Sequence, residues 1–158
     1  MKLVDVLKPA YIKVPLQSSK KEDVIKELIG ELEDHDIFTD PEAIFQAVIE
    51  REKIMTTGVG REVAIPHCKK KECKKFAIAL GLTSNGIDFN SIDKKPVKII
   101  FLLVGPEENP GMHIRLLSRI SRLIAKEQLR EELLQVSDPA AAYTLLEEEE
   151  KKYFEIVS

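Results

Sequence analysis

Histidine is the side chain best suited to accept and release a chemical group near neutral pH, because its imidazole then carries a free lone pair. The sequence holds three of them, His35, His67 and His113. His67 directly follows the run EVAIP at residues 62–66, within the stretch VGREVAIPHCKK. Pro66 lacks an N–H and biases the residue before it to extended geometry. We therefore predict a short strand that presents the His67 imidazole at its end, where function often collects.

The same segment permits other interpretations. A histidine at the end of a strand can simply bond its neighbours. His67, Cys68 and Cys73 offer three possible zinc ligands, but zinc sites usually pair cysteines two to four residues apart and need a fourth ligand, so we disfavour a metal. Adjacent residues of an extended segment point to opposite faces, which argues against a His67–Cys68 dyad and leaves Cys68 as a small packing residue. The lysines that follow suit either a solvated loop or an acidic partner, and they stand at positions 69, 70, 71, 74 and 75.

The other two histidines belong to helical patterns. His35, in ELEDHDIF, comes at the polar end of a predicted helix, where a cation meets the C-terminal dipole, and we interpret it as structural. His113 falls in the first turn of a predicted helix, where free N–H groups attract anions. Taken alone, His113 is open between a structural and a functional role.

The first third of the chain predicts a strand and two helices. Residues 11–17 alternate apolar with polar or small residues, which is typical of a strand. Ser19 and Glu22 have the spacing of a capping box, for a helix with one apolar face that runs to about Asp34. The pair Asp40–Pro41 predicts the start of a second helix, with an N-cap acid and a proline in the first turn.

Two segments in the middle of the chain, residues 75–83 and 96–106, have central runs that are continuously apolar. Such runs are typical of central strands that are covered on both faces. Between them we expect a surface excursion with turns at Asn85–Gly86 and at residues 93–95.

The last third predicts helices. One begins after Asn109–Pro110–Gly111, a shorter one covers about 127–134, and a third opens at Asp138–Pro139. We interpret the four glutamates at 147–150 as a solvated helical face. Strand, two helices, several strands and then helices predict an α/β fold, a three-layer α/β/α sandwich around a mixed central sheet, and we expect residues 1–158 to form a single domain.

The composition excludes several classes of protein. A formal net charge of −3 and interleaved acids and bases argue against nucleic-acid binding. No signal sequence and no long apolar run is visible, which argues against membrane insertion, and two cysteines are too few for a disulfide framework, so we expect a cytoplasmic protein. Neither a P-loop nor a G-x-G-x-x-G fingerprint occurs among the seven glycines, and we expect no cofactor.

A longer pattern around His67 resembles a known active-site signature. It consists of Glu52, six residues, Val59–Gly60, two residues, and the run VAIPHC at residues 63–68. This resembles the fructose and mannitol class of enzyme IIA of the bacterial phosphotransferase system, which includes the nitrogen-regulatory IIA proteins. The resemblance continues through GIDFNSIDKKPVKIIFLLVGP and MHIRLLSRISRLI, so it covers essentially the whole chain.

The resemblance implies both an activity and a set of site residues. By resemblance, His67 accepts a phosphoryl group from the phosphohistidine of HPr and passes it to a cysteine or histidine of a downstream partner, with Nε2 as the implied ring nitrogen. His113 matches the second active-site histidine of the family, and Arg51 matches an arginine near the site. Thr56 and Thr57 are weaker candidates for phosphate contacts. The implied fold is the same three-layer sandwich.

Several functional hypotheses remain open at this point. Within the family, the chain is either a sugar-specific IIA that supplies a IIB domain or a regulatory IIA, and the absence of a fused IIB domain slightly favours the regulatory type. A binding module that has lost phosphotransfer is the alternative from another class, but His67, His113 and Arg51 are all present. An unrelated hydrolase would need carboxylates or a metal set near His67, and none is evident. One departure is Cys68, since relatives often have glycine after the histidine.

Overall fold

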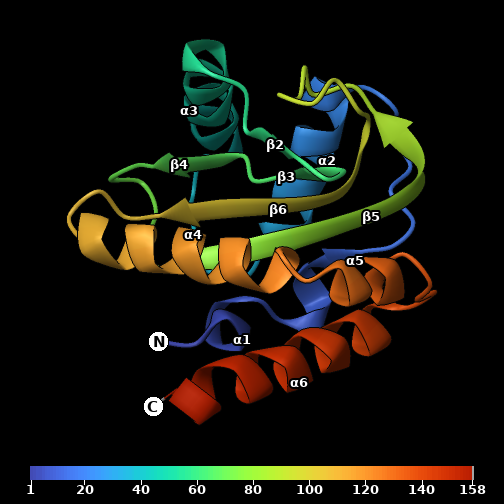
Figure 1. The fold of residues 1–158 in the computed structure, drawn as a ribbon. Helices are drawn as coiled ribbons and strands as arrows, with labels where there is room; N and C mark the ends of the chain where they lie inside the picture. The colour runs from blue at the N-terminus through green and yellow to red at the C-terminus, as the bar shows by residue number, and fades with distance from the viewer. Residues whose placement is uncertain (158) are drawn as a thin grey trace.

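The computed structural model describes residues 1–157, except for the side chains of 155–157. Its architecture is three layers, with a mixed six-stranded sheet between two layers of helices (Figure 1). The central strands are the two long apolar runs, β5 (Ala77–Ile87) and β6 (Val97–Gly105), which pair antiparallel. The predicted α/β/α sandwich with a mixed sheet is therefore confirmed.

Four short strands complete the sheet. They are β1 (Ile12–Lys13), β2 (Gly58–Gly60), β3 (Val63–Ala64) and β4 (His67–Lys69). Strand β1 runs parallel to β5, and both β3 and β4 run parallel to β6. The order is β1-β5-β6-β3-β2, with β4 also paired to β6, so β6 is the strand against which the His67 segment is aligned.

Helices cover both faces of the sheet (Figure 1). One face carries α2 (Lys21–Leu32) and α3 (Pro41–Ile54). The other face carries the remaining helices, which are α1 (Leu3–Val6), the 3₁₀ turn η1 (Pro9–Tyr11), α4 (Pro110–Ile124), α5 (Glu127–Leu133) and α6 (Pro139–Val157). Within residues 1–157 no helix is long and apolar enough to cross a membrane.

The alternation of side chains along β6 explains why the sheet is buried on both faces. Ile100, Leu102 and Val104 pack into the core beneath α2 and α3. Ile99, Phe101 and Leu103 pack with the second group of helices, and all six side chains are fully buried. Successive residues of a strand point to opposite faces, so a continuously apolar run fills two cores at once.

The N-terminal elements differ from the prediction. Only Ile12 and Lys13 of residues 11–17 pair as a strand, because Pro15 has no N–H to donate, although the N–H of Leu16 still bonds the carbonyl of Leu82 at 2.8 Å. The predicted capping box at Ser19 is also wrong. Helix α2 begins one residue later, after Lys20, without a side-chain cap. The carboxylate of Glu27 instead accepts hydrogen bonds from the N–H groups of Gln17 and Ser18, each at 2.9 Å.

The predicted turn at Asn85–Gly86 is wrong as well, because β5 continues through both residues to Ile87. Its register against β6 shifts between Leu82 and Ile87, which lets the strand carry polar residues at this end. A glycine is required at 86, since a Cβ there would lie 2.3 Å from the ring of Pro96. The second predicted turn is confirmed, with the N–H of Lys94 bonded to the carbonyl of Ser91 at 2.9 Å.

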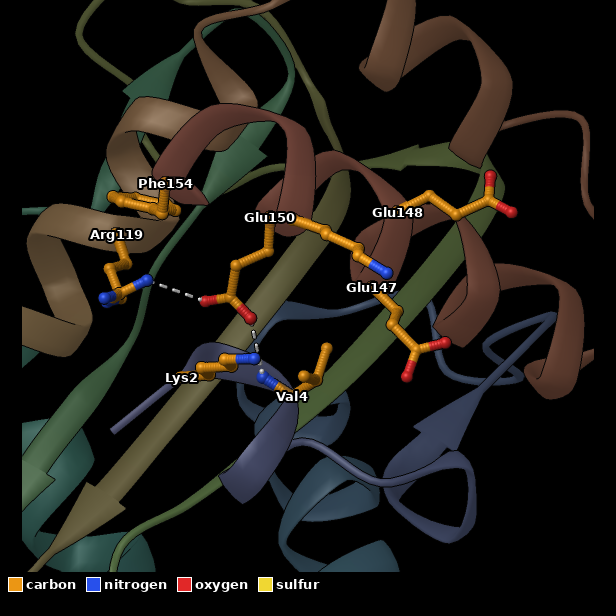
Figure 2. A pocket seen from close by; sticks show the side chains of 8 residues that line it. Lys2, Val4, Arg119, Glu147, Glu148, Glu150 and Phe154 are labelled. Atoms are coloured by element: carbon orange, nitrogen blue, oxygen red, sulfur yellow. Dashed lines mark hydrogen bonds and ion pairs between the residues drawn. The ribbon is translucent and has the colours of Figure 1, made fainter. Parts of the chain in front are cut away.

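The interpretation of the four glutamates as a solvated face is wrong for Glu150, which is only 2% exposed. Its carboxylate accepts the N–H of Leu3 at 2.6 Å and that of Val4 at 3.2 Å, at the start of α1. Arg119 of α4 donates to the same carboxylate at 3.2 Å, as Figure 2 shows. Glu150 therefore joins three helices that are far apart in the sequence, which no local pattern reveals.

Replacement of this carboxylate should destabilise the fold. We expect Glu150→Ala to lower the free energy of unfolding by about 3 kcal/mol, because it leaves two N–H groups unbonded and Arg119 without its partner. Urea unfolding followed by circular dichroism measures the change. Glu148→Ala is the matched control, since this exposed glutamate lies on the same helix and its removal should change stability by less than about 0.5 kcal/mol. Equal stability of the two variants would contradict this role.

Candidate active site

His67 is positioned by two parallel pairings to one strand. Strand β3 pairs at Ile99 and Ile100 of β6, and β4 resumes the pairing with His67 opposite Leu103. Pro66 interrupts the pairing between them, although its carbonyl still accepts the N–H of Leu103 at 3.0 Å. His67 is therefore the first residue of a second strand and not the end of the first, which corrects the prediction. The interruption leaves its side chain half-buried.

A hydrogen bond fixes the orientation of the His67 ring. Nδ1 lies 2.8 Å from the carbonyl oxygen of Ile65. A carbonyl oxygen only accepts, so Nδ1 carries the hydrogen and donates it. In a neutral imidazole the other nitrogen is then unprotonated. The geometry thus leaves Nε2 with a free lone pair.

The surroundings of His67 favour this neutral form. Burial lowers the pKa of His67 below its ordinary value of 6.5, and the positive charges of Arg51 and Lys69 lower it further. The bond to Ile65 and the carboxylate of Glu52 act in the opposite direction, without reversing the net effect. At neutral pH, the His67 ring is therefore uncharged.

His113 lies against His67, with the two ring centroids 5.3 Å apart. It belongs to the first turn of α4, where the Asn109 side chain accepts the N–H of Met112 at 3.2 Å as an N-cap. The His113 side chain is only 2% exposed, and neither ring nitrogen has a hydrogen-bond partner within the described part of the chain. An unpartnered buried polar group is costly, so two ring nitrogens left in this state beside a second histidine are typical of a functional site.

Burial also keeps His113 uncharged. Desolvation lowers the pKa of His113 to about 4, with smaller contributions from His67 and Lys69. A neutral imidazole has one N–H to donate and one nitrogen that accepts. At physiological pH, His113 is thus a hydrogen-bond donor that brings no charge of its own.

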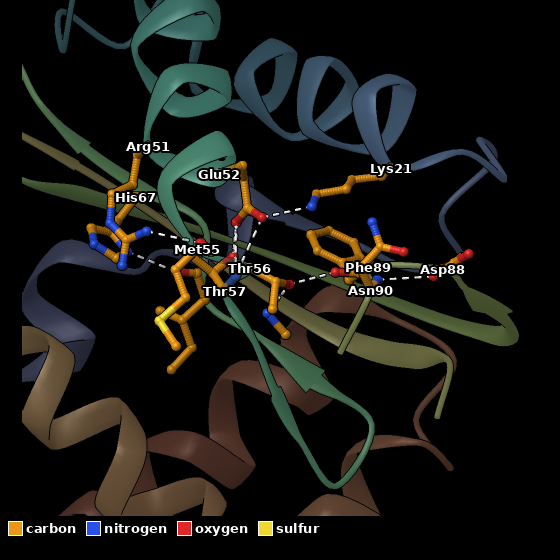
Figure 3. Close-up of polar contacts among 12 residues, drawn as sticks. Lys21, Arg51, Glu52, Met55, Thr56, Thr57, His67, Asp88, Phe89 and Asn90 are labelled. Carbon is orange, nitrogen blue, oxygen red and sulfur yellow. Dashed lines mark hydrogen bonds and ion pairs between the residues drawn. The ribbon is translucent and has the colours of Figure 1, made fainter. Parts of the chain in front are cut away.

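Arg51 comes from the last turn of α3. Its Nη1 donates to the carbonyl oxygen of Met55 at 2.9 Å, and Figure 3 shows its guanidinium beside the His67 ring. The bond to the end of its own helix holds the side chain in place, and the remaining N–H groups of the planar guanidinium can bind an anion. The structure therefore brings the three residues predicted as catalytic into one place, from three separate elements.

Thr56 and Thr57 lie in the loop after α3, but their hydroxyls point into the protein. Thr56 donates its hydroxyl hydrogen to the carbonyl of Phe89, and Thr57 donates to the carboxylate of Glu52 (Figure 3). Their predicted contact with phosphate stays a prediction. Glu52 was named in the sequence only as the first position of the signature, and its buried contacts with this loop are a part of the site that sequence reasoning missed.

The two cysteines next to the site are structural. Cys68 and Cys73 are both free and buried in the core beneath α2 and α3. Burial raises the pKa of Cys68 to about 12 and that of Cys73 to about 11, so neither is a thiolate at neutral pH. Among the described residues no group of three or more His, Cys, Asp or Glu side chains is placed to hold a metal ion.

Exposed apolar side chains directly follow the site residues on α3 and α4. Ile54 and Met55 follow Arg51 at the end of α3, with exposed fractions of 80% and 61%. Ile114 follows His113 on α4 and is 65% exposed. Large apolar side chains at this exposure, next to reactive groups, are typical of a surface that another protein covers.

The comparison with known families identifies the chain. The family described as "Phosphoenolpyruvate-dependent sugar phosphotransferase system, EIIA 2" matches residues 5–149. The chain belongs to this family. It is an enzyme IIA of type 2, and the resemblance drawn from the signature around His67 is confirmed.

The relatives of this enzyme IIA carry two kinds of name. It is 32% identical to the fructose-specific EIIABC component of Bacillus subtilis over 96% of the chain, which spans 24% of that larger protein. It is also 32% identical to a nitrogen regulatory protein of Bradyrhizobium diazoefficiens, over 92% of the chain and 95% of the relative. These two relatives, one fructose-specific and one nitrogen-regulatory, thus have the same identity to the chain.

A solved structure confirms the arrangement of the enzyme IIA fold. The nitrogen regulatory protein IIA-Ntr of Neisseria meningitidis superposes with a TM-score of 0.85 at 28% identity, over 91% of this chain and 98% of that one. The three-layer sandwich with its mixed sheet is therefore that of the family.

Proposed function

We propose that this enzyme IIA carries a phosphoryl group on Nε2 of His67, which it receives from the phosphohistidine of an HPr-type carrier protein. The observation that carries the proposal is the bond from Nδ1 of His67 to the carbonyl of Ile65, which leaves Nε2 as the free nitrogen. The fall in the pKa of His67 supports it, because the ring is then uncharged when the donor arrives.

The transfer step exchanges one nitrogen–phosphorus bond for another. The Nε2 lone pair of His67 attacks the phosphorus, a new N–P bond forms, and the bond to the donor imidazole breaks. The electron pair of that bond returns to the donor nitrogen. Phosphoryl transfer needs mainly positioning and stabilisation of charge on the three equatorial oxygens. No nucleotide is involved in this step.

Arg51 and His113 supply that stabilisation in the proposal. The guanidinium of Arg51 is a permanent cation with several N–H donors, and it lies beside the His67 ring. His113 has its centroid 5.3 Å from that of His67 and has an N–H to donate. Arg51 would bind the phosphoryl oxygens as a cation, and His113 would bind them as a neutral hydrogen-bond donor.

The phosphorylated protein has two possible roles downstream. The phosphoryl group passes to a IIB domain, as the combined EIIABC name of the Bacillus relative suggests, or the phosphorylation state is read by a regulatory target, as the name of the Bradyrhizobium relative suggests. Both roles use the same chemistry at His67. Since the donor is a carrier protein of the cell interior, the proposal includes a cytoplasmic location.

Incubation with enzyme I, the cognate HPr and labelled phosphoenolpyruvate tests the proposal. We expect acid-labile label on this protein, as for a phosphohistidine. A chase with a purified IIB domain then separates the two roles, because only a transport IIA is expected to lose its label quickly. Absence of label with an active cognate HPr would contradict phosphotransfer and favour a binding module.

The exposed apolar residues should act in docking. We expect Met55→Glu and Ile114→Glu each to raise the KM for phosphorylated HPr about tenfold, because each places a charge where the partner packs, with kcat little changed. Initial rates at varied donor concentration measure both constants. Tyr153→Glu on α6 is the control, since this side chain is also exposed but lies outside the group around His67. An unchanged KM in both test variants would contradict this docking surface.

A further inference from the structure

Glu52 is a buried carboxylate with an unusual number of contacts. Its side chain is only 4% exposed, and it forms an ion pair with Lys21 of α2 at 2.7 Å. Both of its oxygens lie 3.2 Å from the N–H of Thr57, and one accepts the Thr57 hydroxyl as well. Burial of a carboxylate is costly unless its oxygens are bonded, and here the bonds come from one ion pair and one loop residue.

These contacts continue to the ring of His67. The carbonyl of Thr57 accepts the N–H of Ile65 at 3.0 Å. The carbonyl of Ile65 in turn accepts the hydrogen of Nδ1 of His67 at 2.8 Å. Figure 3 shows the Glu52 carboxylate at one end of this series and the His67 imidazole at the other. Glu52 is also the neighbour of Arg51 on α3, so one helix end anchors the loop and supplies the guanidinium.

We propose that Glu52 is a positioning residue for phosphoryl transfer, which holds the Thr57 loop so that the Ile65 carbonyl keeps His67 with its hydrogen on Nδ1 and its lone pair on Nε2. The expected effect on the rate of phosphoryl transfer rests on the proposed function. The expected effect on the tautomer of the His67 ring does not, because it can be measured without any donor protein.

The closest variant is Glu52→Gln, which has the same shape but no charge. Its amide loses the ion pair with Lys21, and it has one oxygen in place of two for the N–H and hydroxyl of Thr57. We expect kcat for phosphoryl acceptance to fall by about tenfold to a hundredfold, since small misplacements of a reacting group have effects of this size. The KM for phosphorylated HPr should change little, because the exposed apolar residues are untouched.

Glu50→Gln is the matched control. It removes the same charge from the same helix two positions earlier, but from an exposed side chain. We expect it to keep the wild-type kcat. Circular dichroism and thermal unfolding show whether both variants are folded, so that their kcat values can be compared.

A spectroscopic measurement separates positioning from stability. In ¹⁵N NMR the protonated and unprotonated ring nitrogens have distinct chemical shifts, so the tautomer of His67 can be observed directly above its pKa. We expect the wild type and Glu50→Gln to show the hydrogen on Nδ1, and Glu52→Gln to show a mixture of both tautomers. A single Nδ1–H tautomer in folded Glu52→Gln, with an unchanged kcat, would overturn the inference.

A second variant tests the same chain of contacts should Glu52→Gln unfold. Thr57→Val removes the hydroxyl that bonds Glu52, whereas Thr57→Ser keeps it. We expect Thr57→Val to lower kcat and Thr57→Ser to retain most of it. If Glu52→Gln does fold and the hydroxyl acts through Glu52, the double variant Glu52→Gln/Thr57→Val is about as slow as Glu52→Gln alone. Multiplied losses would overturn this route and favour a direct contact of Thr57 with phosphate.

The two arms of the experiment distinguish the failure of each proposal. If wild-type protein accepts no phosphoryl group, the proposed function fails, but the tautomer comparison still decides whether Glu52 positions the ring. If wild type is phosphorylated and folded Glu52→Gln matches it in kcat and tautomer, only the positioning role fails.

Discussion

The His67→Ala protein is expected to fold normally and to accept no phosphoryl group. The imidazole is half-buried and makes one hydrogen bond, to Ile65, so its loss should change the free energy of unfolding by about 1 kcal/mol or less. The nucleophile is lost completely, and no other group replaces it. The buried thiol of Cys68 has a pKa of about 12, and both ring nitrogens of His113 are buried.

Labelling from phosphoenolpyruvate through enzyme I and HPr measures this effect. His35→Ala is the control, because this third histidine packs against the ring of Tyr11 at 5.0 Å between centroids, and it should be labelled like wild type. Label on His67→Ala at the wild-type rate would contradict the assignment of the acceptor.

His113→Ala is expected to have the second large effect, on the rate of phosphoryl transfer. Loss of a positioned donor to developing charge costs about a hundredfold in rate. We expect a slower transfer of this size with an intact fold and a label that still resides on His67. Stopped-flow or quench-flow rates with phosphorylated HPr provide the measurement, and a wild-type rate would exclude His113 from the site.

The same variant should also change the dependence of stability on pH. The pKa of His113 is about 4 in the folded protein and 6.5 in the unfolded chain, so between these values only the unfolded chain binds the proton. Acidification from pH 6.5 to 4 therefore favours unfolding, by about 3 kcal/mol for this group, and the full stability is present above pH 6.5.

Urea unfolding of wild type and His113→Ala across this pH range isolates that contribution. We expect the stability of wild type relative to the variant to fall by about 3 kcal/mol as the pH falls. Parallel curves for the two proteins would show that His113 titrates at its ordinary pKa, in conflict with its burial beside His67.

The elements that carry local signals were predictable from the sequence. Asp40 caps α3 with a bond to the N–H of Ala43 at 3.1 Å, and Asp138 accepts the N–H of Ala141 at 2.9 Å at the start of α6. Both precede a proline, which fits the first turn of a helix. The apolar runs of β5 and β6 predicted central strands because a strand buried on both faces has no polar alternation.

The errors arose where distant residues decide the outcome. Glu150 belongs to the same run of four glutamates as residues 147–149, which are exposed or half-buried. Its burial is explained only by its distant partners, which are the N–H groups of Leu3 and Val4 and the guanidinium of Arg119. Asn85–Gly86 has the composition of a turn, but pairing with β6 extends the strand through it. Propensity is a weak prior that such tertiary contacts override.

The residues of the candidate site could be named from the sequence, but their geometry could not. The signature led to His67, and the family resemblance to His113 and Arg51. The anchoring of Nδ1 by the carbonyl of Ile65 depends on the backbone path after Pro66, and the role of Glu52 depends on a loop that folds back onto α3. A sequence pattern records residue types, but it does not record which backbone carbonyl meets a ring nitrogen.

The assignment of Nε2 of His67 as the phosphoryl acceptor is tested most directly by locating the phosphorus on the protein. Uniformly ¹⁵N-labelled wild type is phosphorylated through enzyme I and HPr, and ³¹P–¹⁵N couplings then identify the bonded nitrogen. We predict that the phosphoryl group is on Nε2 of His67, with Nδ1 still protonated. Phosphorus on Nδ1, on His113 or His35, or on no histidine at all would contradict it.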